Sequence, residues 1–157
     1  MLLTSLRRYE AGDREAVWSL HNQALHAAGA HPGSGAWDDD LHAIEEHYIE
    51  PGGDFIVGFV DDELVAMGAI RRGAERRAEI KRMRVHPRYQ RQGAGRQILA
   101  RLEARAVALG YREMVLETTT QQPAARGFYE KHGYTVCDEF KRGSFDIVRY
   151  QRTLCQT

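Results

Sequence analysis

Apolar and polar residues follow one another along the chain in patterns that predict a series of strands and helices. Short apolar runs bounded by turn residues predict strands over 2–8, 55–60, 64–71, 79–85, 113–117, 134–140 and 145–154. Apolar residues three or four positions apart predict helices that begin at Asp13, Asp38, Gly95 and Pro123. The glycine- and proline-rich segment 29–36 fits neither pattern and is expected to be a loop.

The order of these segments predicts one α/β domain over residues 1–157, with a mixed, mostly antiparallel sheet flanked by helices. The short connections between residues 55 and 85 are typical of antiparallel neighbours. The helix that starts at Gly95 lies between two strands, and a strand–helix–strand unit makes those strands parallel through a right-handed crossover. The complete order is β-α-α-β-β-β-α-β-α-β-β.

The composition is that of a soluble protein of a reducing compartment. A chain of 157 residues is about one domain. Its two cysteines, Cys137 and Cys155, are too few for a disulfide framework and lack the spacing of metal ligands. The apolar stretch at the N-terminus is too short for a signal peptide, and no run reaches membrane-spanning length. We therefore expect a cytoplasmic protein with no membrane partner.

The formal net charge of zero conceals a strong asymmetry along the chain. Residues 1–70 hold 3 basic and 13 acidic residues, whereas residues 71–105 hold 12 basic and 3 acidic ones. The basic block surrounds a glycine-rich turn, which favours an anionic ligand over an ordinary solvated face. Only Tyr89 lies among its arginines, so the block lacks the aromatic residues of a nucleic-acid platform and we expect no nucleic-acid partner. The acidic first half fits a cationic substrate or simply exposed carboxylates.

Five of the seven histidines lie between His21 and His47, but their spacing disfavours a metal site. His21 and His26 are five residues apart, as are His42 and His47. Five positions correspond to about 140° around a helix, so neither pair shares a face as zinc ligands on a helix would. We expect no bound metal.

The turn Gly93-Ala94-Gly95 leads into a predicted helix and has the form of an anion site. The first N–H groups of a helix lack intrahelical partners and point along the positive end of its dipole. The arginines nearby, such as Arg91 and Arg96, would add positive charge. A plain glycine turn with solvated arginines is the alternative. A dinucleotide fingerprint fits poorly because Ile98 stands where its third glycine would be, and no Gly-Lys-Ser/Thr marks a P-loop.

The segment Val85-His86-Pro87, followed by Gln90-Arg91-Gln92-Gly93-Ala94-Gly95, resembles the Q/R-x-x-G-x-G/A signature of the GNAT family of N-acetyltransferases. Segments 7–13 and 128–134 match the family in the same order. The resemblance implies an enzyme that uses acetyl-CoA to acetylate a primary amine, on a small molecule or a peptide, by direct transfer in a ternary complex. It also implies a set of cofactor-binding residues: Met83, Arg84 and Val85 along the pantetheine arm, Gln90, Arg91, Gln92, Gly93, Ala94, Gly95 and Arg96 around the pyrophosphate, and Gln122 and Tyr129.

Two catalytic residues follow from the resemblance. Tyr129 matches the family tyrosine that protonates the departing thiolate, and a phenol with a pKa near 10 is protonated at neutral pH. The apolar face of a short helix is the alternative reading of this residue. Glu79 is the candidate base, with a surface carboxylate paired to Arg77 or Lys81 as its alternative and Glu117 as a second candidate base.

One departure from the family pattern concerns the pantetheine contact, because Gln122 stands where many members have asparagine.

The region between residues 21 and 53 occupies the position of the variable acceptor wall, so the sequence leaves the amine unidentified. A non-catalytic sensor that binds acyl-CoA is the alternative function. A homodimer formed by sheet-edge pairing also stays open.

Overall fold

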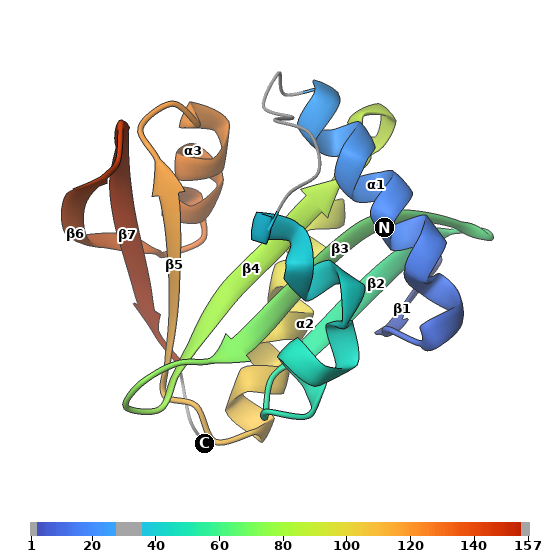
Figure 1. Cartoon of the computed structure of the whole chain (residues 1–157), viewed down its shortest axis with the longest axis horizontal. Helices are drawn as coiled ribbons and strands as arrows, with labels where there is room; N and C mark the ends of the chain where they lie inside the picture. Colours follow the sequence, from blue (N-terminus) through green and yellow to red (C-terminus); the bar gives the residue numbers. More distant parts are fainter. Residues whose placement is uncertain (1–2, 28–35, 155–157) are drawn as a thin grey trace.

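A computed structural model of the chain describes residues 3–27 and 36–154. Its strands form one seven-stranded sheet in the order β1-β2-β3-β4-β5-β7-β6 (Figure 1). Every neighbouring pair is antiparallel except β4 and β5, which are parallel. The strands are β1 (Ser5–Arg8), β2 (Asp54–Val60), β3 (Glu63–Arg72), β4 (Arg77–Val85), β5 (Glu113–Thr119), β6 (Thr135–Arg142) and β7 (Phe145–Thr153). The predicted mixed, mostly antiparallel sheet is confirmed.

Within the described residues, three α-helices and four shorter helical segments connect the strands. They are η1 (Ala11–Asp13), α1 (Arg14–Ala27), η2 (Ala36–His42), η3 (Glu45–Ile49), η4 (Pro87–Tyr89), α2 (Ala94–Ala108) and α3 (Pro123–Lys131). The helix predicted from Asp38 is not an α-helix, because it forms the 3-10 segment η2 and then the π-helical segment η3. Its apolar residues Leu41, Ile44 and Tyr48 are nevertheless buried as the pattern predicted. The predicted loop 29–36 lies outside the described residues except for Ala36.

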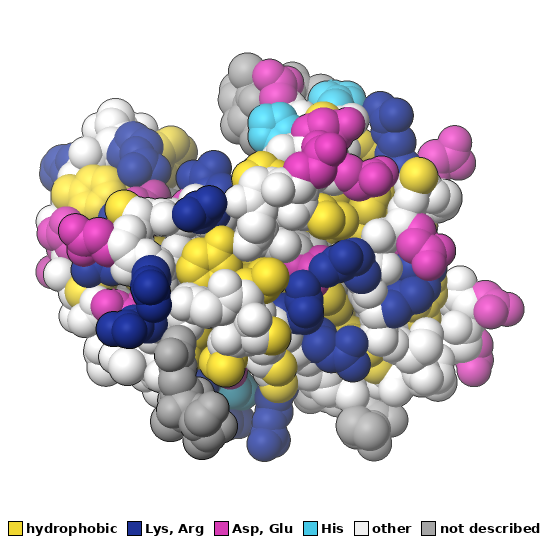
Figure 2. Space-filling view, turned by 90° about the horizontal axis from the view of Figure 1, so that it is seen from below, with side chains coloured by type: hydrophobic (Ala, Val, Ile, Leu, Met, Phe, Trp, Pro, Cys, Tyr) yellow, Lys and Arg dark blue, Asp and Glu magenta, His cyan; other side chains and the backbone are white. Residues whose placement is uncertain are grey.

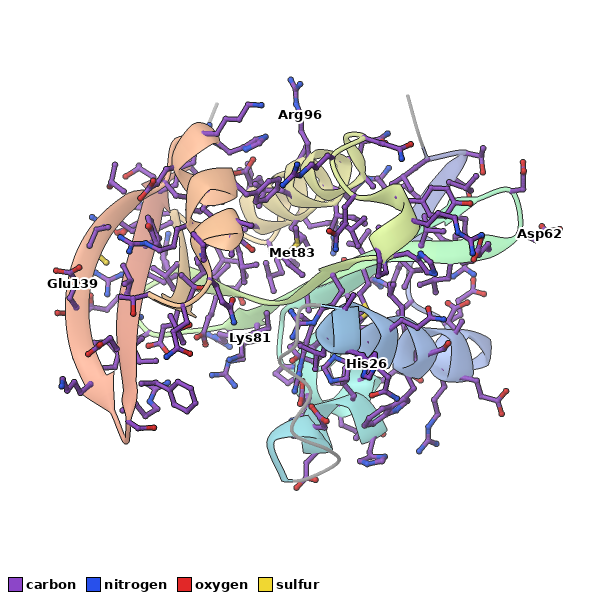
Figure 3. The ribbon with its side chains drawn as sticks, turned by 90° about the horizontal axis from the view of Figure 1, so that it is seen from above. His26, Asp62, Lys81, Met83, Arg96 and Glu139 are labelled. Atoms are coloured by element: carbon purple, nitrogen blue, oxygen red, sulfur yellow. The ribbon has the colours of Figure 1, made fainter. Side chains whose placement is uncertain are left out.

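Helices cover both faces of the sheet, as Figures 1 and 3 show. Residues of α1, η2 and η3 share one core cluster, and residues of α2 and α3 share another with the opposite face. Strand β2 contributes to both: Phe55 and Val57 belong to the cluster that contains Leu20, whereas Ile56 belongs to the cluster that contains Ile98. Because successive side chains of a strand point to opposite faces, a run of apolar residues is what a central strand covered on both sides requires.

A group of Asp, Glu and His side chains lies at one edge of the face in Figure 2, and Lys and Arg side chains are spread across its middle. Cys137 is exposed on β6, and Cys155 lies outside the described residues. Among the described residues, no helix is long and apolar enough to cross a membrane.

The sheet opens between β4 and β5 because their pairing stops early. Within the described ladder the two strands pair only from Arg77↔Glu113 to Glu79↔Val115. Beyond Glu79, β4 stays with β3 and β5 stays with β7, which leaves a wedge between them.

A bulge in β4 accompanies this separation. Lys81 pairs with Ala69 and Arg84 with Met67, so two β4 residues, one of them Arg82, oppose the single residue Gly68. Arg82 has φ +60°, a left-handed conformation that is uncommon for a residue with a Cβ. A Cβ at Gly68 would lie 2.5 Å from the Met83 sulfur and 2.7 Å from Cγ2 of the buried Ile98, so a larger residue would displace core side chains. Bulges bend and twist a strand, and this one coincides with the wedge.

Candidate active site

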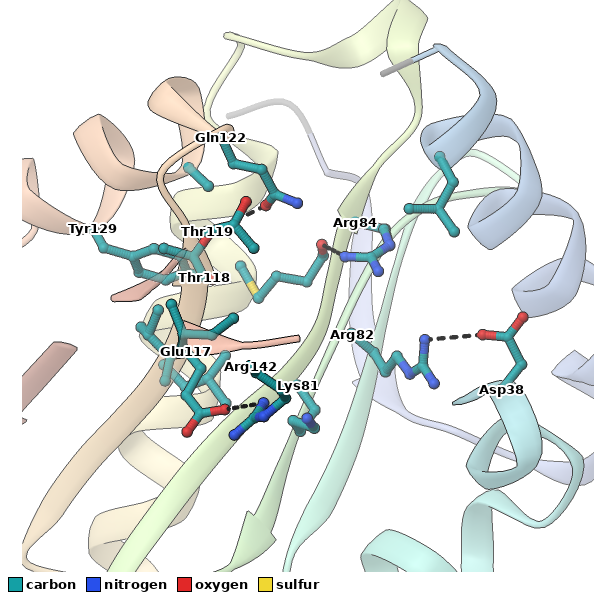
Figure 4. Close-up of a pocket in the computed structure, with 16 residues that line it drawn as sticks. Asp38, Lys81, Arg82, Arg84, Glu117, Thr118, Thr119, Gln122, Tyr129 and Arg142 are labelled. Atoms are coloured by element: carbon teal, nitrogen blue, oxygen red, sulfur yellow. Dashed lines mark hydrogen bonds and ion pairs between the residues drawn. The ribbon is translucent and has the colours of Figure 1, made fainter. Parts of the chain in front are cut away.

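A cavity of about 510 Å³ lies in the wedge between β4 and β5 (Figure 4). Its walls come from several parts of the chain: α1 and η2 on one side, β4 at the base, and β5, α3 and the β6–β7 hairpin on the other. Of the residues predicted from the sequence, Met83, Arg84, Gln122 and Tyr129 line it, as does the second candidate base Glu117. The remaining lining residues are Leu25, Asp38, Ile80, Lys81, Arg82, Leu116, Thr118, Thr119, Ala125, Arg142 and Ile147.

Tyr129 is held firmly in the cavity wall. Its side chain is 7% exposed, and its ring packs edge-on against Phe128 and Tyr134 at centroid distances of 5.1 and 5.6 Å. Burial raises the pKa of Tyr129, and the positive charge of Arg84 acts in the opposite direction. The phenol therefore stays protonated at neutral pH and has a proton to donate into the cavity.

The glycine turn has the conformation that the anion-site hypothesis requires. Gly93 is the N-cap of α2 with φ +93°, and no side chain caps the first turn of the helix. Two side-chain amides hold the turn from outside, because Gln90 donates to the carbonyl oxygen of Val85 at 3.3 Å and Gln92 to that of Arg88 at 3.2 Å. The backbone N–H groups at the start of α2 are therefore left for a ligand.

The turn adjoins the cavity without lining it. Val85 and residues 90–96 are absent from the cavity wall. A Cβ at Gly95 would lie 3.4 Å from the ring of Phe128, so the turn packs directly against the helix that carries Tyr129. Arg96 points away from the sheet on the outer side of α2 (Figure 3). A ligand that spans the turn and the cavity would thus pass along the open edge of β4.

The two candidate bases occupy different surroundings. Glu79 lies in the paired part of β4, outside the cavity wall, and its carboxylate accepts a hydrogen bond from Arg71 at 2.7 Å. The partner is thus neither Arg77 nor Lys81, the two considered from the sequence. Glu117 lines the cavity and accepts from Arg142 at 2.9 Å. Of the two carboxylates, Glu117 lines the cavity and Glu79 does not.

A buried polar network forms the wall opposite Tyr129. The Arg82 guanidinium donates to Asp40 through Nε at 2.9 Å and to Asp38 at 3.3 Å. Asp38 also contacts His21 at 3.1 Å, and the Tyr48 hydroxyl donates to Asp40. The side chain of Arg82 is 13% exposed and that of Asp38 is 5% exposed. This network joins α1, η2 and η3 to the bulge of β4, and the sequence analysis did not find it.

His21 belongs to this network through its contact with Asp38. Burial and the neighbouring charges of Arg84 and Arg82 lower the pKa of His21, while Asp38 acts to raise it. Its Nδ1 atom is buried without a hydrogen-bond partner, which fits a neutral ring that carries its proton on Nε2 and donates it to Asp38. No three His, Cys, Asp or Glu side chains group as metal ligands within residues 3–27 and 36–154.

Gln122 is the N-cap residue of α3 and lies just after the end of β5. Its side-chain oxygen accepts a hydrogen bond from the hydroxyl of Thr118 at 3.1 Å. Pro123 follows as the first residue of α3, a position where its missing N–H costs nothing. The amide predicted to contact pantetheine therefore lies at the cavity wall, held by a neighbouring threonine.

Comparison with known proteins is consistent across sequence and structure. The model of the "Acetyltransferase (GNAT) family" matches residues 14–134. A Bacillus subtilis (strain 168) relative named "Uncharacterized N-acetyltransferase YsnE" is 31% identical over 127 residues, 79% of this chain and 82% of the relative. An acetyltransferase of the GNAT family from Staphylococcus aureus superposes with a TM-score of 0.86 at 18% identity, over 96% of this chain and 99% of that chain. The PaiA N-acetyltransferase of Thermoplasma acidophilum, solved with coenzyme A, gives 0.77 at 20% identity over 92% and 96%.

Proposed function

The chain belongs to the GNAT family of acetyltransferases, and we propose that it acetylates a primary amine with acetyl-CoA by direct transfer in a ternary complex. The observation that supports this most directly is the buried Tyr129 in the wedge between β4 and β5, next to a glycine turn that opens the N-terminus of α2. Tyr129 thus offers a proton for a leaving group, and the glycine turn offers backbone N–H groups to an anion. We further propose that residues 1–157 act as one N-acetyltransferase domain.

The chain provides a separate place for each part of the coenzyme. The phosphates suit the backbone N–H groups of the turn over residues 90–96, because a helix N-terminus favours negative charge. The backbone of residues 83–85 on the open edge of β4 suits the amide groups of the pantetheine arm, in the manner of an added strand. Gln122 is the candidate for a further amide contact. The bound coenzyme supplies an acetyl group activated as a thioester.

The residues of the cavity can carry the proton movements of the transfer. The amine nitrogen forms a bond to the thioester carbonyl carbon, the carbon–sulfur bond breaks, and the Tyr129 hydroxyl protonates the departing thiolate. The amine loses a proton, which we assign to Glu117 through water and not to Glu79. The acceptor is expected to react in its neutral form, because only an unprotonated amine nitrogen has the lone pair that attacks the carbonyl carbon.

Replacing the proton donor tests this proposal. In Tyr129→Phe, kcat for coenzyme A release should fall by about 10²- to 10⁴-fold, the usual contribution of a general acid. Tyr89→Phe is the matched control, because that hydroxyl contacts Glu63 away from the cavity. The measurement is thiol release over a panel of primary amines. Equal rates for wild type and Tyr129→Phe would refute the acid assignment, and tight acetyl-CoA binding without release for any amine would favour the sensor.

Two matched substitutions separate the candidate bases. Glu117→Gln should lower kcat/KM, whereas Glu79→Gln should leave kcat/KM unchanged because its carboxylate faces Arg71 outside the cavity. Thiol release measured for both variants with the same amine would decide between them. A lower kcat/KM in Glu79→Gln alone would reverse the assignment.

A further inference from the structure

The wall of the cavity carries two cationic side chains that form no ion pair with an acidic side chain of the chain, and from them we infer the substrate class. We propose that the acceptor is a primary amine that also carries a carboxylate, as an amino acid does, and that Arg84 binds this carboxylate with support from Lys81. The inference rests on the proposed acetyl transfer and adds the identity of the group that selects the amine.

The charges of the cavity wall do not cancel. Four cationic side chains line it, namely Lys81, Arg82, Arg84 and Arg142, against the two anionic side chains Asp38 and Glu117. Arg82 is engaged by Asp38 and by Asp40 behind it, and Arg142 is engaged by Glu117. Lys81 and Arg84 remain. All 22 acidic side chains of the sequence belong to the described residues, and none of them forms an ion pair with either cation.

Arg84 lies in the cavity wall and has N–H donors that are not used in hydrogen bonds within the protein. Its Nη1 atom donates to the carbonyl oxygen of Met83 at 2.8 Å, which fixes the side chain against β4. Its Nε atom is buried and has no hydrogen-bond partner. A guanidinium has five N–H donors in a planar fork that matches a carboxylate, so a half-buried and incompletely satisfied one is suited to an anionic ligand.

The coenzyme itself would not neutralise these cations. The phosphates of acetyl-CoA belong at the turn over residues 90–96, which does not line the cavity. The pantetheine arm that would enter the wedge carries amide groups without charge. An anionic partner for Arg84 would therefore come from the second substrate.

The positions of the side chains orient such a substrate. In Figure 4, Arg84 extends from β4 toward the side of α1, whereas Tyr129 lies on the opposite side with α3 and β5. A carboxylate held by Arg84 would leave the amine to face the Tyr129 side, where the thioester is expected. Positive charge nearby also lowers the pKa of the bound amine, which favours its neutral, nucleophilic form. Polycationic acceptors are disfavoured by the same charge.

Matched substrates give the most direct test. Each amino acid of a panel is compared with its carboxamide and with its decarboxylated amine, and kcat/KM is measured by thiol release. For the preferred side chain, the free acid should exceed its carboxamide by roughly tenfold to a hundredfold, as expected for a hydrogen-bonded charge pair. Carboxamides or decarboxylated amines that react as well as the acids would overturn the inference.

A charge-removing substitution assigns the effect to one residue. In Arg84→Met the acid-to-carboxamide ratio should collapse toward one, and in Lys81→Met it should fall by a smaller factor. Arg101→Met, which removes an exposed charge on α2, is the matched control and should keep the wild-type ratio. A general loss of activity lowers kcat/KM for the acid and the carboxamide alike, so it does not change their ratio. An unchanged ratio in Arg84→Met would contradict the assignment.

Three further outcomes complete the test. If Arg84→Met does not fold, carboxylic acids without an amine should still inhibit the wild-type enzyme competitively with the acceptor, and absence of inhibition would overturn the inference. Failure to bind acetyl-CoA, together with no coenzyme A release for any amine, would overturn the proposed function and this inference with it. Acetylation of amines without regard to a carboxylate would overturn this inference alone.

Discussion

Replacing Arg82 by methionine should destabilise the protein more than any exposed charge deletion. Arg82 holds the bulge of β4 in a left-handed conformation, φ +60°, and its guanidinium binds Asp38 and Asp40. All three side chains are largely buried, with exposures of 13%, 5% and 19%. The substitution keeps much of the volume and removes the charge, so it leaves two buried carboxylates without their cation.

The expected loss follows from this burial. Breaking a buried ion pair by removing one partner costs about 3–5 kcal/mol, since the remaining charge is uncompensated. Asp38 keeps His21 and Asp40 keeps Tyr48 as partners, so we expect a value near the lower end, about 3 kcal/mol. Urea unfolding followed by circular dichroism measures the change in the free energy of unfolding.

Arg71→Met is the matched control for this measurement. Arg71 pairs with Glu79 at 2.7 Å, but its side chain is 50% exposed, and such surface pairs contribute about 0–1 kcal/mol. Equal losses in the two variants would refute the reasoning from burial.

The pH dependence gives a second readout for Arg82→Met. Burial acts to raise the pKa of Asp40, but hydrogen bonds from Arg82 and Tyr48 hold it below its ordinary value. The stability that this carboxylate contributes is therefore present above a pH of about 4 and is lost as the pH falls through its folded pKa. The variant lacks most of that contribution, so its deficit relative to wild type should shrink as the pH is lowered toward about 3.

Three other predictions concern single residues. Gly93→Ala places a Cβ at φ +93° and should cost about 1–2 kcal/mol in urea unfolding, whereas Gly127→Ala, in open space on α3, should stabilise by about 0.5–1 kcal/mol. Gly95→Val should weaken acetyl-CoA binding in calorimetry because its side chain meets Phe128; unchanged affinity would contradict the placement of the turn. Because burial lowers the pKa of His21, unfolding free energy should fall as the pH drops below about 6.5, and His21→Gln should flatten that slope.

The sheet was predictable because its strands have local signatures. The apolar run around Met114 and the turn at Gly110 mark β5, and the helix before it requires the parallel crossover that the structure confirms. Family membership was also within reach, since the turn at Gly93 and the segment ending at Tyr134 lie in the family order and the comparisons bear it out.

The polar wall of the cavity was not predictable, because its contacts join distant segments. Arg82 and Asp38 are 44 residues apart in sequence, and nothing local indicates that a bulge turns Arg82 toward η2. The Asp38 and Asp40 side chains that contact Arg82 lie in the 3-10 segment η2, which is followed by the π-helical segment η3. For this region the apolar spacing alone predicted an ordinary α-helix. Glu79 was assigned to the correct strand, but it lies in the last pair before β4 and β5 separate. Only the register of the two strands shows where the pairing ends and the wedge begins.

Titration of the purified protein with acetyl-CoA tests the central claim most directly. Isothermal calorimetry should show saturable binding with one coenzyme per chain. The same complex should release coenzyme A when an acceptor amine is added, and in Tyr129→Phe that release should slow while binding persists. Absence of binding, in calorimetry and in thermal stabilisation alike, would contradict the assignment of the wedge and the glycine turn as a coenzyme site.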